Sequence, residues 1–453
     1  MGRRRTRRQL LATLGAAALV GGAGCLDDGS STPTDASPVD SAYDLSVAHD
    51  IERWERYDPD WVPSETDPTD ADLAVETVIE GLEIPWDIAF AANGEFFLSE
   101  RIGRISRYEA GTLEEVTRPA DVIDHARAAE MDVGYDWWAG GSEGGLLGIA
   151  VHPNYPDVPL LYAFYTYGAG EEEYRNRLVY YDVTEDEPDE TVVIDDIAGN
   201  RIIHNGARIA FGPRNYLWVT TGDAGEESLP QRTDRLAGKV LRMEPDGSAP
   251  AETPGFDDPR IFSYGHRNPQ AISWLPDGTT IVSEHGPAAR DEVLLVDAGD
   301  NHGWPDVRGP PDDDDYEAYA DHEDVAPPLV NTGTETWAPA GGVFYGGEAV
   351  PALRNRFLSA GLRSQRLNVV SLFREEPPAI GGRVHDDPWT HPDYDAVSHQ
   401  LFEHELGRLR HVEWAPDGSL YAITSNRDGR SELPEEDSFP REGDDRLVRI
   451  VQR

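Results

Sequence analysis

The stretch that decides the fold is an apolar hairpin near the C-terminus, VEWAPDGSLYAI at residues 412–423. Apolar and polar residues alternate on both sides of a Pro-Asp-Gly turn, which is the pattern of two antiparallel strands joined by a tight loop. A second clear copy is WDIAFAANGEFFLSE at residues 86–100. The further copies lie at residues 148–165, 207–221, 271–283 and, in degenerate form, 341–359. The chain therefore contains six copies of one hairpin.

The spacing of these copies indicates how the hairpins assemble. They recur at intervals of about 60 residues, which is enough for a four-stranded antiparallel blade with long loops. Six such units use almost all of residues 71–453, so we predict an all-β fold, a six-bladed β-propeller that forms one domain. A β-sandwich or a solenoid is the alternative, but loops bearing Gly, His, Arg and Asp beside the hairpins favour radial closure. Strands near 74–79 and 447–451 are expected to pair and close the ring.

The composition suits this fold and carries an extreme charge balance. The 453 residues include 44 Gly, 34 Pro and 41 aromatic residues (11 Trp, 18 Tyr and 12 Phe), enough for many turns around a sizeable core. Asp and Glu number 85 against 39 Lys and Arg, and Lys239 is the only lysine. A net charge of −46 argues against nucleic acid as a partner. It indicates adaptation to high salt, where the screening length falls to about 3 Å and carboxylates repel one another weakly.

The first 25 residues predict an export signal. Five arginines precede an apolar stretch over 10–23 that is too short to span a bilayer comfortably. The run TRRQLL at 6–11 matches the twin-arginine pattern, and GAGC at 22–25 places small residues before Cys25. We expect a lipid on Cys25 to anchor the exported protein to the outer face of the cytoplasmic membrane, and this is its only expected membrane contact.

Cys25 is the only cysteine, so no disulfide can form within the chain and the core itself must stabilise the exported domain. Residues 26–70 are rich in Asp, Ser, Thr and Pro. This composition predicts a solvated tether that holds the propeller domain, residues 71–453, away from the membrane.

Four polar segments lie beside the repeated strands, where the loops of a propeller gather around its channel. They are EGGLLG at 143–148, HNGAR at 204–208, GHRNPQ at 265–270, and EHGP at 284–287 followed by Asp291, Glu292 and NHGWP at 301–305. In this order the segments resemble the soluble PQQ-dependent glucose dehydrogenase and aldose sugar dehydrogenase family. WAP at 337–339, GRLR at 407–410 and PDG at 416–418 also fit, so the resemblance extends over about residues 75–450.

The resemblance implies a six-bladed propeller that holds pyrroloquinoline quinone (PQQ) and calcium at the channel mouth. It implies oxidation of an aldose at the anomeric carbon to a lactone, with electrons passed to an external acceptor. It assigns His204 as the general base, and an imidazole suits removal of a hydroxyl proton near neutral pH. Taken alone, a histidine before Asn-Gly is more often an ordinary loop residue.

The same resemblance assigns Arg267 and Asn268 to contacts with the quinone. A fixed cation such as Arg267 can act in catalysis by stabilising negative charge that grows on a carbonyl oxygen during hydride transfer. Arg408 and Arg410 are two positions apart on one strand and would face the carboxylates of the cofactor. From the residues alone, a surface turn paired with an acidic neighbour also explains Arg267, and a solvated strand face explains Arg408 and Arg410.

Calcium is placed by the resemblance on the backbone carbonyls of Gly286 and Pro287, which suits a hard cation that prefers oxygen ligands. His285 and Asp291 are expected to contact the cofactor. Glu292 and the carbonyl of His302 match a second, structural calcium site.

Three features depart from the family pattern. Glu143 stands where some members have Gln, and Arg363 stands about where a cofactor-binding Lys is expected. Both are kept as cofactor-binding candidates. The acidic loop 310–328 is unlike the family, and its composition favours a hydrated surface over an ion-binding site.

Two other classes of function stay open at this stage. One is a cofactor-free propeller that binds carbohydrate or protein, and the other is a calcium-dependent hydrolase of the lactonase type. The fold alone does not choose among the three classes. The set that favours the dehydrogenase is His204, Arg267, Asn268, Gly286, Pro287 and Asp291.

The charge balance generates a first prediction. We expect the purified protein to lose structure as salt is lowered from molar levels to those of ordinary buffers, because weaker screening strengthens repulsion among surface carboxylates. The measurement is the melting temperature, followed by circular dichroism across a salt titration. A melting temperature that stays constant across the titration would reject salt adaptation as the cause of the composition.

Overall fold

The computed structural model describes residues 37–109, 111–123, 142–171, 173–428 and 439–453. The expected signal peptide with Cys25, and the first part of the expected tether at 26–36, lie outside these described residues. Within the described ranges the protein consists of β-strands and short 3₁₀ turns, and no helix there is long and apolar enough to cross a membrane. The 3₁₀ turns are Ile51–Arg53, Pro68–Asp70, Pro213–Asn215, Tyr319–Asp321 and Pro351–Leu353.

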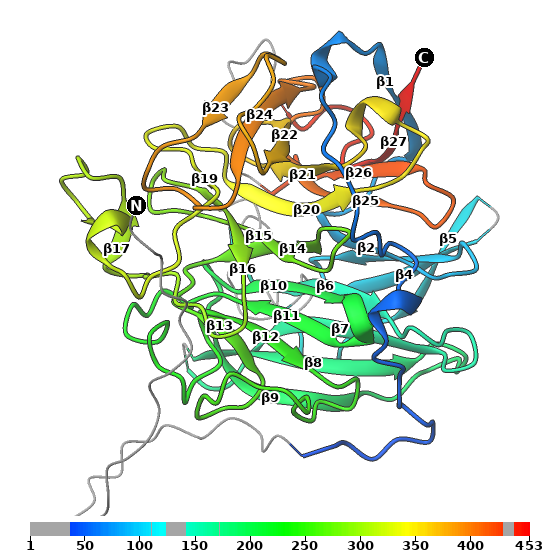
Figure 1. The fold of residues 1–453 in the computed structure, drawn as a ribbon. Coiled ribbons are helices and arrows are strands. Elements are labelled where there is room, and N and C mark those ends of the chain that lie inside the picture. The colour runs from blue at the N-terminus through cyan, green and yellow to red at the C-terminus, as the bar shows by residue number, and fades with distance from the viewer. Residues whose placement is uncertain (1–36, 110, 124–141, 172, 429–438) are drawn as a thin grey trace, which may run out of the picture. The chain divides into compact units, whose positions relative to one another are not determined.

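Six antiparallel sheets form the blades of a β-propeller (Figure 1), so the predicted fold is confirmed. From the channel outward, the first blade consists of β2 (Pro85–Phe90), β3 (Phe96–Glu100), β4 (Arg104–Glu109) and β5 (Thr112–Thr117), and the second of β6 (Leu146–Val151), β7 (Leu160–Gly168), β8 (Tyr174–Asp182) and β9 (Thr191–Gly199). The third consists of β10 (Gly206–Phe211), β11 (Leu217–Thr221), β12 (Lys239–Met243) and β13 (Ile261–Tyr264), and the fourth of β14 (Pro269–Trp274), β15 (Thr280–Glu284), β16 (Glu292–Val296) and β19 (Val330–Asn331). The fifth consists of β20 (Pro339–Tyr345), β21 (Arg356–Gly361), β22 (Arg366–Phe373) and β24 (Asp395–Leu401), and the sixth of β25 (Leu409–Trp414), β26 (Leu420–Thr424), β27 (Leu447–Gln452) and β1 (Leu73–Ile79). The fifth blade carries an additional outer strand, β23 (Arg383–His385). A separate parallel pair, β17 (Val307–Gly309) and β18 (Glu317–Ala318), lies in the long connection between β16 and β19.

The ring closes through strands from opposite ends of the chain. β1 pairs with β27 in antiparallel register, with Leu73 opposite Gln452 and Thr77 opposite Val448. This is the closure expected from the sequence. It completes the sixth blade with three strands from the C-terminal end and one from the N-terminal end.

The innermost strands β2, β6, β10, β14, β20 and β25 contact one another in sequence around the channel. Small residues permit this close approach. A Cβ at Gly148 on β6 would collide with the carbonyl oxygen of Ala207 on β10, and a Cβ at Gly341 on β20 would collide with the ring of His411 on β25. Glycine is therefore required at both positions for the inner strands to pack.

A buried polar cluster cross-links the inner strands across the channel. Asp87 on β2 forms an ion pair with Arg208 on β10, and its Oδ1 lies 3.3 Å from Nε2 of His411 on β25. The guanidinium of Arg208 also lies 4.1 Å from the ring centre of Trp86. Each of these side chains is almost wholly buried, so the charges are compensated by one another rather than by water.

The solvated tether expected over 26–70 differs from the structure in its described part. Residues 37–70 lie against the blades: Leu45 is buried in the cluster shared by the second and third blades, and Trp61 packs edge-on against Phe344 of the fifth. Figure 1 shows this segment, in dark blue, passing along the blades to β1. Its apolar anchors are widely spaced among Asp, Ser, Thr and Pro, which is why the composition suggested a solvated chain.

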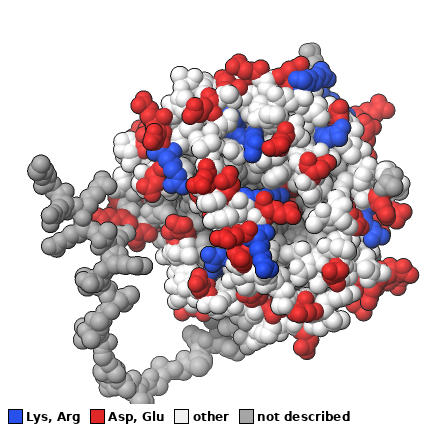
Figure 2. All heavy atoms as spheres, turned by 45° about the vertical axis from the view of Figure 1, so that its right-hand side comes forward, with Lys and Arg blue, Asp and Glu red and all other residues white. Residues whose placement is uncertain are grey.

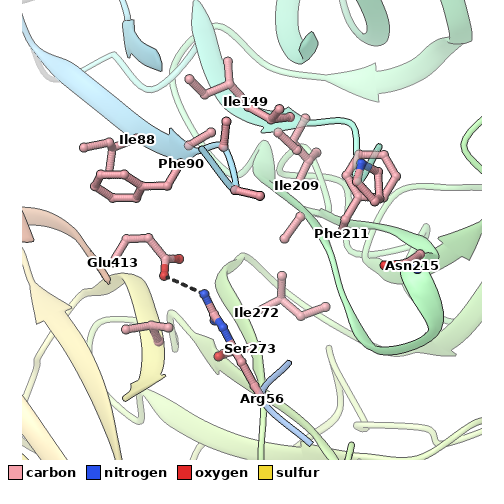
Figure 3. A pocket seen from close by; sticks show the side chains of 18 of the residues that line it. Arg56, Ile88, Phe90, Ile149, Ile209, Phe211, Asn215, Ile272, Ser273 and Glu413 are labelled. Atoms are coloured by element: carbon pink, nitrogen blue, oxygen red, sulfur yellow. Dashed lines mark ion pairs between the residues drawn. The ribbon is translucent and has the colours of Figure 1, made fainter. Parts of the chain in front are cut away.

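This segment also covers one end of the channel. The C-terminal ends of the six inner strands line a cavity of about 430 Å³ there, and Arg56 of the segment faces Glu413 with Nη2 and Oε1 3.8 Å apart. Figure 3 shows Phe90, Ile209 and Ile272 lining the same cavity. The polar segments singled out in the sequence lie where β6, β10 and β14 begin and where β15 ends, so they belong to the other end.

The surface shows the expected charge balance. Figure 2 shows Asp and Glu side chains spread over the whole face in view, with fewer Lys and Arg side chains among them. The single lysine does not contribute to it, because Lys239 is wholly buried and its Nζ donates to the carbonyl oxygens of Leu229, Pro230 and Ala237 at 3.0, 2.9 and 2.6 Å.

A buried histidine at the end of β6 predicts how stability depends on pH. His152 is 1 % exposed, and burial lowers its pKa from 6.5 to about 4. Between these values the unfolded chain binds a proton that the folded protein does not, so the free energy of unfolding falls as the pH is lowered from about 6.5 towards 4. The loss from this one residue should be about 2 kcal/mol at pH 5.

The variant His152→Asn tests this effect. The Nδ1 of His152 accepts a hydrogen bond from the backbone N of Asn154, and an Asn oxygen can take over that role. Denaturant unfolding at fixed high salt should show a smaller loss of stability between pH 7 and pH 5 in the variant than in the natural protein. Equal losses in the two proteins would contradict the assignment.

Candidate active site

The polar segments singled out in the sequence meet at one end of the channel. The inner strands begin at this end, so the residues just before β10, β14 and β25 gather there with the turns that follow β11 and β15. Two contacts tie the loops of the third and fourth blades together: Gly206 N donates to Asn268 Oδ1 at 3.0 Å, and Asp223 N donates to Arg267 O at 2.8 Å.

His204 is held in a fixed orientation at this end of the channel. Its backbone has φ of 57° and its N donates to Glu143 Oε2 at 2.9 Å. The ring Nδ1 lies 2.7 Å from Oδ1 of Asp223. A carboxylate can only accept, so Nδ1 carries the hydrogen and Nε2 is the basic ring nitrogen. The side chain is 13 % exposed, so it remains open to a ligand.

Asp223 is a candidate site residue that the sequence did not reveal. Its carboxylate is buried and accepts hydrogen bonds from Gly225 N at 2.7 Å and from the indole Nε1 of Trp304 at 2.8 Å, in addition to His204. These donors hold the carboxylate in place, and the carboxylate in turn orients the imidazole. The signal that could have indicated it is a Gly-Asp-Ala-Gly turn directly after a repeat strand.

Arg267 and Asn268 both face the same site and are incompletely paired. Arg267 N donates to Glu284 Oε1 at 2.9 Å, its Nη1 donates to His285 O at 3.3 Å, and its guanidinium lies 5.3 Å from the ring centre of Trp304. Its Nε and the Nδ2 of Asn268 are buried without a hydrogen-bond partner among the described residues. The surface-turn alternative for Arg267 does not agree with this placement.

The turn from His285 to Asp291 carries the carbonyls that are expected to bind a metal ion, and it follows β15 at this end of the channel. A Cβ at Gly286 would collide with the carbonyl oxygens of Ala289 and Arg290, so only glycine fits this turn. The Nε2 of His285 is buried and has no partner in the described part of the chain. Loss of hydration lowers the pKa of His285 to about 4, which keeps its imidazole neutral at working pH.

Asp291 ends this turn, and its carboxylate holds the turn in place through hydrogen bonds. Its Oδ1 accepts from Gly286 N at 2.8 Å, and its Oδ2 accepts from Trp337 N at 2.6 Å and Ala338 N at 2.9 Å. The resemblance implied a contact with the cofactor. The structure gives the Asp291 carboxylate three backbone donors, so that it joins the turn of the fourth blade to the loop that enters the fifth.

Arg408 and Arg410 are buried, so a solvated strand face does not describe them. Arg408 donates to Asp428 Oδ2 through Nε and Nη2 at 3.1 and 2.8 Å, and Arg410 Nη1 donates to Gln270 Oε1 at 3.1 Å. The Nε of Arg410 has no partner among the described residues. Arg410 therefore retains a donor for a ligand, while Arg408 is engaged by Asp428.

Glu143 and Arg363, which depart from the family pattern, differ in how far they are buried. Glu143 lines the same small cavity as Arg101 and Arg410, and its carboxylate accepts from the backbone of His204. Its charge is thus used inside the site. Arg363 is in the turn between β21 and β22, and its N donates to Trp337 O at 3.2 Å.

The acidic loop 310–328 contacts the turn that carries Gly286 and Pro287. Asp313 and Asp315 accept from Arg290 Nη2, each at 3.0 Å. A hydrated surface therefore describes only part of the loop, because these two carboxylates pair with Arg290.

Glu292 has other partners than those expected of a calcium ligand. It is buried, with Oε1 accepting from Tyr319 Oη and Asn331 Nδ2, and Oε2 lying 2.8 Å from Arg308 Nη1. The ring of His302 is buried against that of His266, with centres 4.6 Å apart. In the described residues, no three His, Cys, Asp or Glu side chains gather in an arrangement that could hold a metal ion.

Comparison with known proteins shows to which family this propeller belongs. The model of the glucose/sorbosone dehydrogenase family matches residues 82–433. A crystal structure from Thermus thermophilus, described as an oxidoreductase and glucose dehydrogenase, is 34% identical and covers 84% of this chain and 100% of its own, with a TM-score of 0.65. The PQQ-bound aldose sugar dehydrogenase from Streptomyces coelicolor is 29% identical and covers 86% of this chain and 100% of its own, with a TM-score of 0.63.

A curated relative points the same way. The aldose sugar dehydrogenase YliI of Escherichia coli is 25% identical over 381 residues, covering 79% of this chain and 92% of its own. The family match extends over all four polar segments and over the inner strands of all six blades. The chain belongs to the glucose/sorbosone dehydrogenase family of oxidoreductases.

Proposed function

We propose that this protein oxidises aldose sugars at the anomeric carbon to lactones, using PQQ and calcium at the channel mouth and an external electron acceptor. The observation that carries the proposal is the meeting, at one end of the channel, of an oriented His204–Asp223 pair with buried donors that lack partners among the described residues. The PQQ named in the Streptomyces relative supports the choice of cofactor.

The unpaired donors are the test of whether PQQ fits these residues. Leaving a buried donor without a partner costs free energy, so several in one place indicate a ligand that accepts hydrogen bonds. PQQ carries two quinone oxygens and three carboxylates, which are acceptors of this kind. The residues that would hold it are Arg267, Asn268, His285 and Arg410, with Arg408 contributing positive charge through its pair with Asp428.

Calcium fits the turn at Gly286 and Pro287, because the backbone carbonyls of the turn are oxygen ligands and Asp291 holds the turn in place through Gly286 N. When bound, the two groups supply a two-electron acceptor and a Lewis acid that polarises it.

The chain's own residues then provide acid–base chemistry and orientation. Nε2 of His204 takes the proton of the anomeric hydroxyl, and the carboxylate of Asp223 stabilises the imidazolium that results. Trp304 keeps Asp223 in position through its indole donor. The guanidinium of Arg267, held by His285 O and Trp304, would supply a fixed positive charge to stabilise negative charge on a bound quinone.

The proposal includes the place of action. The signal over residues 1–25 and Cys25 support export and lipid anchoring to the outer face of the cytoplasmic membrane. A cofactor-free binding propeller and a lactonase-type hydrolase are both less well supported, because family membership and the unpaired donors favour a bound redox cofactor.

The first experiment separates these classes of function. Apo-protein in high salt with calcium should bind PQQ with one cofactor per chain and then reduce an artificial dye when aldoses are added. A binding propeller would take up sugar without reducing the dye, and a lactonase would need calcium but not PQQ. If PQQ neither binds nor supports dye reduction with a broad panel of aldoses, the proposal is wrong.

A second experiment examines the base and its partner. His204→Ala should lower kcat by about a hundredfold or more, because the proton acceptor is removed, while PQQ still binds. Asp223→Asn should lower kcat by at least about tenfold, since a neutral amide no longer stabilises the imidazolium or fixes its tautomer. The control His322→Ala changes a histidine that pairs with Glu317 in the connection between β16 and β19, and should leave kcat unchanged. Unchanged turnover of His204→Ala at saturating sugar would contradict the assignment.

A further inference from the structure

Arg308 is a buried cation beneath the candidate active site. It lies on β17 and is wholly buried. Its Nη1 is 2.7 Å from Glu284 Oε1 and 2.8 Å from Glu292 Oε2, and its Nη2 donates to His285 O at 3.3 Å. One guanidinium thus joins two wholly buried carboxylates and the backbone that leads into the Gly286–Pro287 turn.

Three of the four oxygens of these two carboxylates are engaged in hydrogen bonds within the protein. Glu292 Oε1 accepts from Tyr319 Oη at 2.7 Å and from Asn331 Nδ2 at 2.9 Å. Glu284 Oε2 is 2.8 Å from His266 Nδ1, and its Oε1 also accepts from Arg267 N. The remaining oxygen, Glu292 Oε2, has no hydrogen-bond partner among the described residues and is compensated only by the Arg308 guanidinium, 2.8 Å away.

The donor set does not suit calcium either. Calcium takes six to eight oxygens at about 2.3–2.6 Å, and a cation at Glu292 would lie against the positively charged guanidinium. The second calcium site that the resemblance implied at Glu292 and the carbonyl of His302 therefore does not fit, because the Arg308 guanidinium already lies against Glu292 Oε2.

We propose that Arg308 takes the place of that second cation. The guanidinium neutralises charge between Glu284 and Glu292, as a bound metal would, but it is covalently part of the chain and cannot dissociate. Through Glu284 it fixes the backbone of Arg267, and through the carbonyl of His285 it fixes the turn that carries Gly286 and Pro287. Arg308 is a positioning residue that acts through these groups.

The test is whether removing the guanidinium creates a calcium dependence. Arg308→Ala leaves two buried carboxylates facing a space without a counter-charge, so the variant should melt several degrees lower in the presence of a chelator. Millimolar calcium should restore about half or more of this loss, because a ligand that binds only the folded state stabilises it. Melting is followed by circular dichroism on the full chain without PQQ, in high salt.

Two further variants make the result specific. In Arg308→Ala/Glu292→Gln the restoration by calcium should disappear, because one of the two carboxylates is gone. Arg356→Ala removes another wholly buried arginine, whose guanidinium donates to the hydroxyls of Ser371 and Ser64. It should lose stability without gaining a response to calcium.

Calcium bound to the natural protein gives an independent measurement. Equilibrium dialysis should show that Glu292→Gln binds as many calcium ions as the natural protein does. A calcium ion that is lost in Glu292→Gln, or an Arg308→Ala variant that folds and shows no response to calcium, would overturn the inference. Failure to bind PQQ would count against the proposed function alone, because none of these measurements involves the cofactor.

Discussion

The pairing of β1 with β27 is the constraint on which the site depends. The candidate side chains come from several blades: His204 precedes the third, Arg267 and Asn268 precede the fourth, and Arg408 precedes the sixth. These residues meet only if the six inner strands form a closed ring, and the ring closes only when the N-terminal strand completes the last blade. The residues are far apart in the chain, so their meeting is a property of the closed propeller.

Within the ring, charge is distributed unevenly between surface and interior. The chain has many more acidic than basic residues, yet its largest wholly buried side chains include Arg101, Arg260, Arg308, Arg356 and Lys239. Surface carboxylates are hydrated and screened by salt, whereas a buried carboxylate needs a partner nearby. Glu284 pairs with Arg308, Asp428 pairs with Arg408, and Asp87 pairs with Arg208. Several of the scarce cations are thus placed where screening by salt cannot replace them.

The fold could be predicted from the sequence because its signal is local and repeated. Six hairpins with alternating apolar residues indicated six blades, and the terminal strands indicated the closure that β1 and β27 make. The segment at 37–70 was misjudged, since its anchors Leu45 and Trp61 are single residues in a polar stretch and make long-range contacts. Asp223 and Arg308 were missed for the same reason: a buried charge is recognised by its partners, and those partners are distant in sequence. The segments around His204, Arg267 and Gly286 were found because each combines several polar residues beside a repeat strand.

The connection between β16 and β19 shows how one long loop can support a site built from several blades. It supplies Trp304, whose indole donates to Asp223; Arg308, which joins Glu284 to Glu292; and Asp313, which pairs with Arg290. The first of these contacts fixes the partner of His204, the second fixes the backbone of Arg267, and the third fixes the turn at Gly286. A loop with high intrinsic mobility could not hold three such groups, but β17 and β18 pair within it, and Tyr319 and Val325 pack into a small core with Val307. The position of the proposed base therefore depends on a packed excursion from the next blade as well as on its own strand.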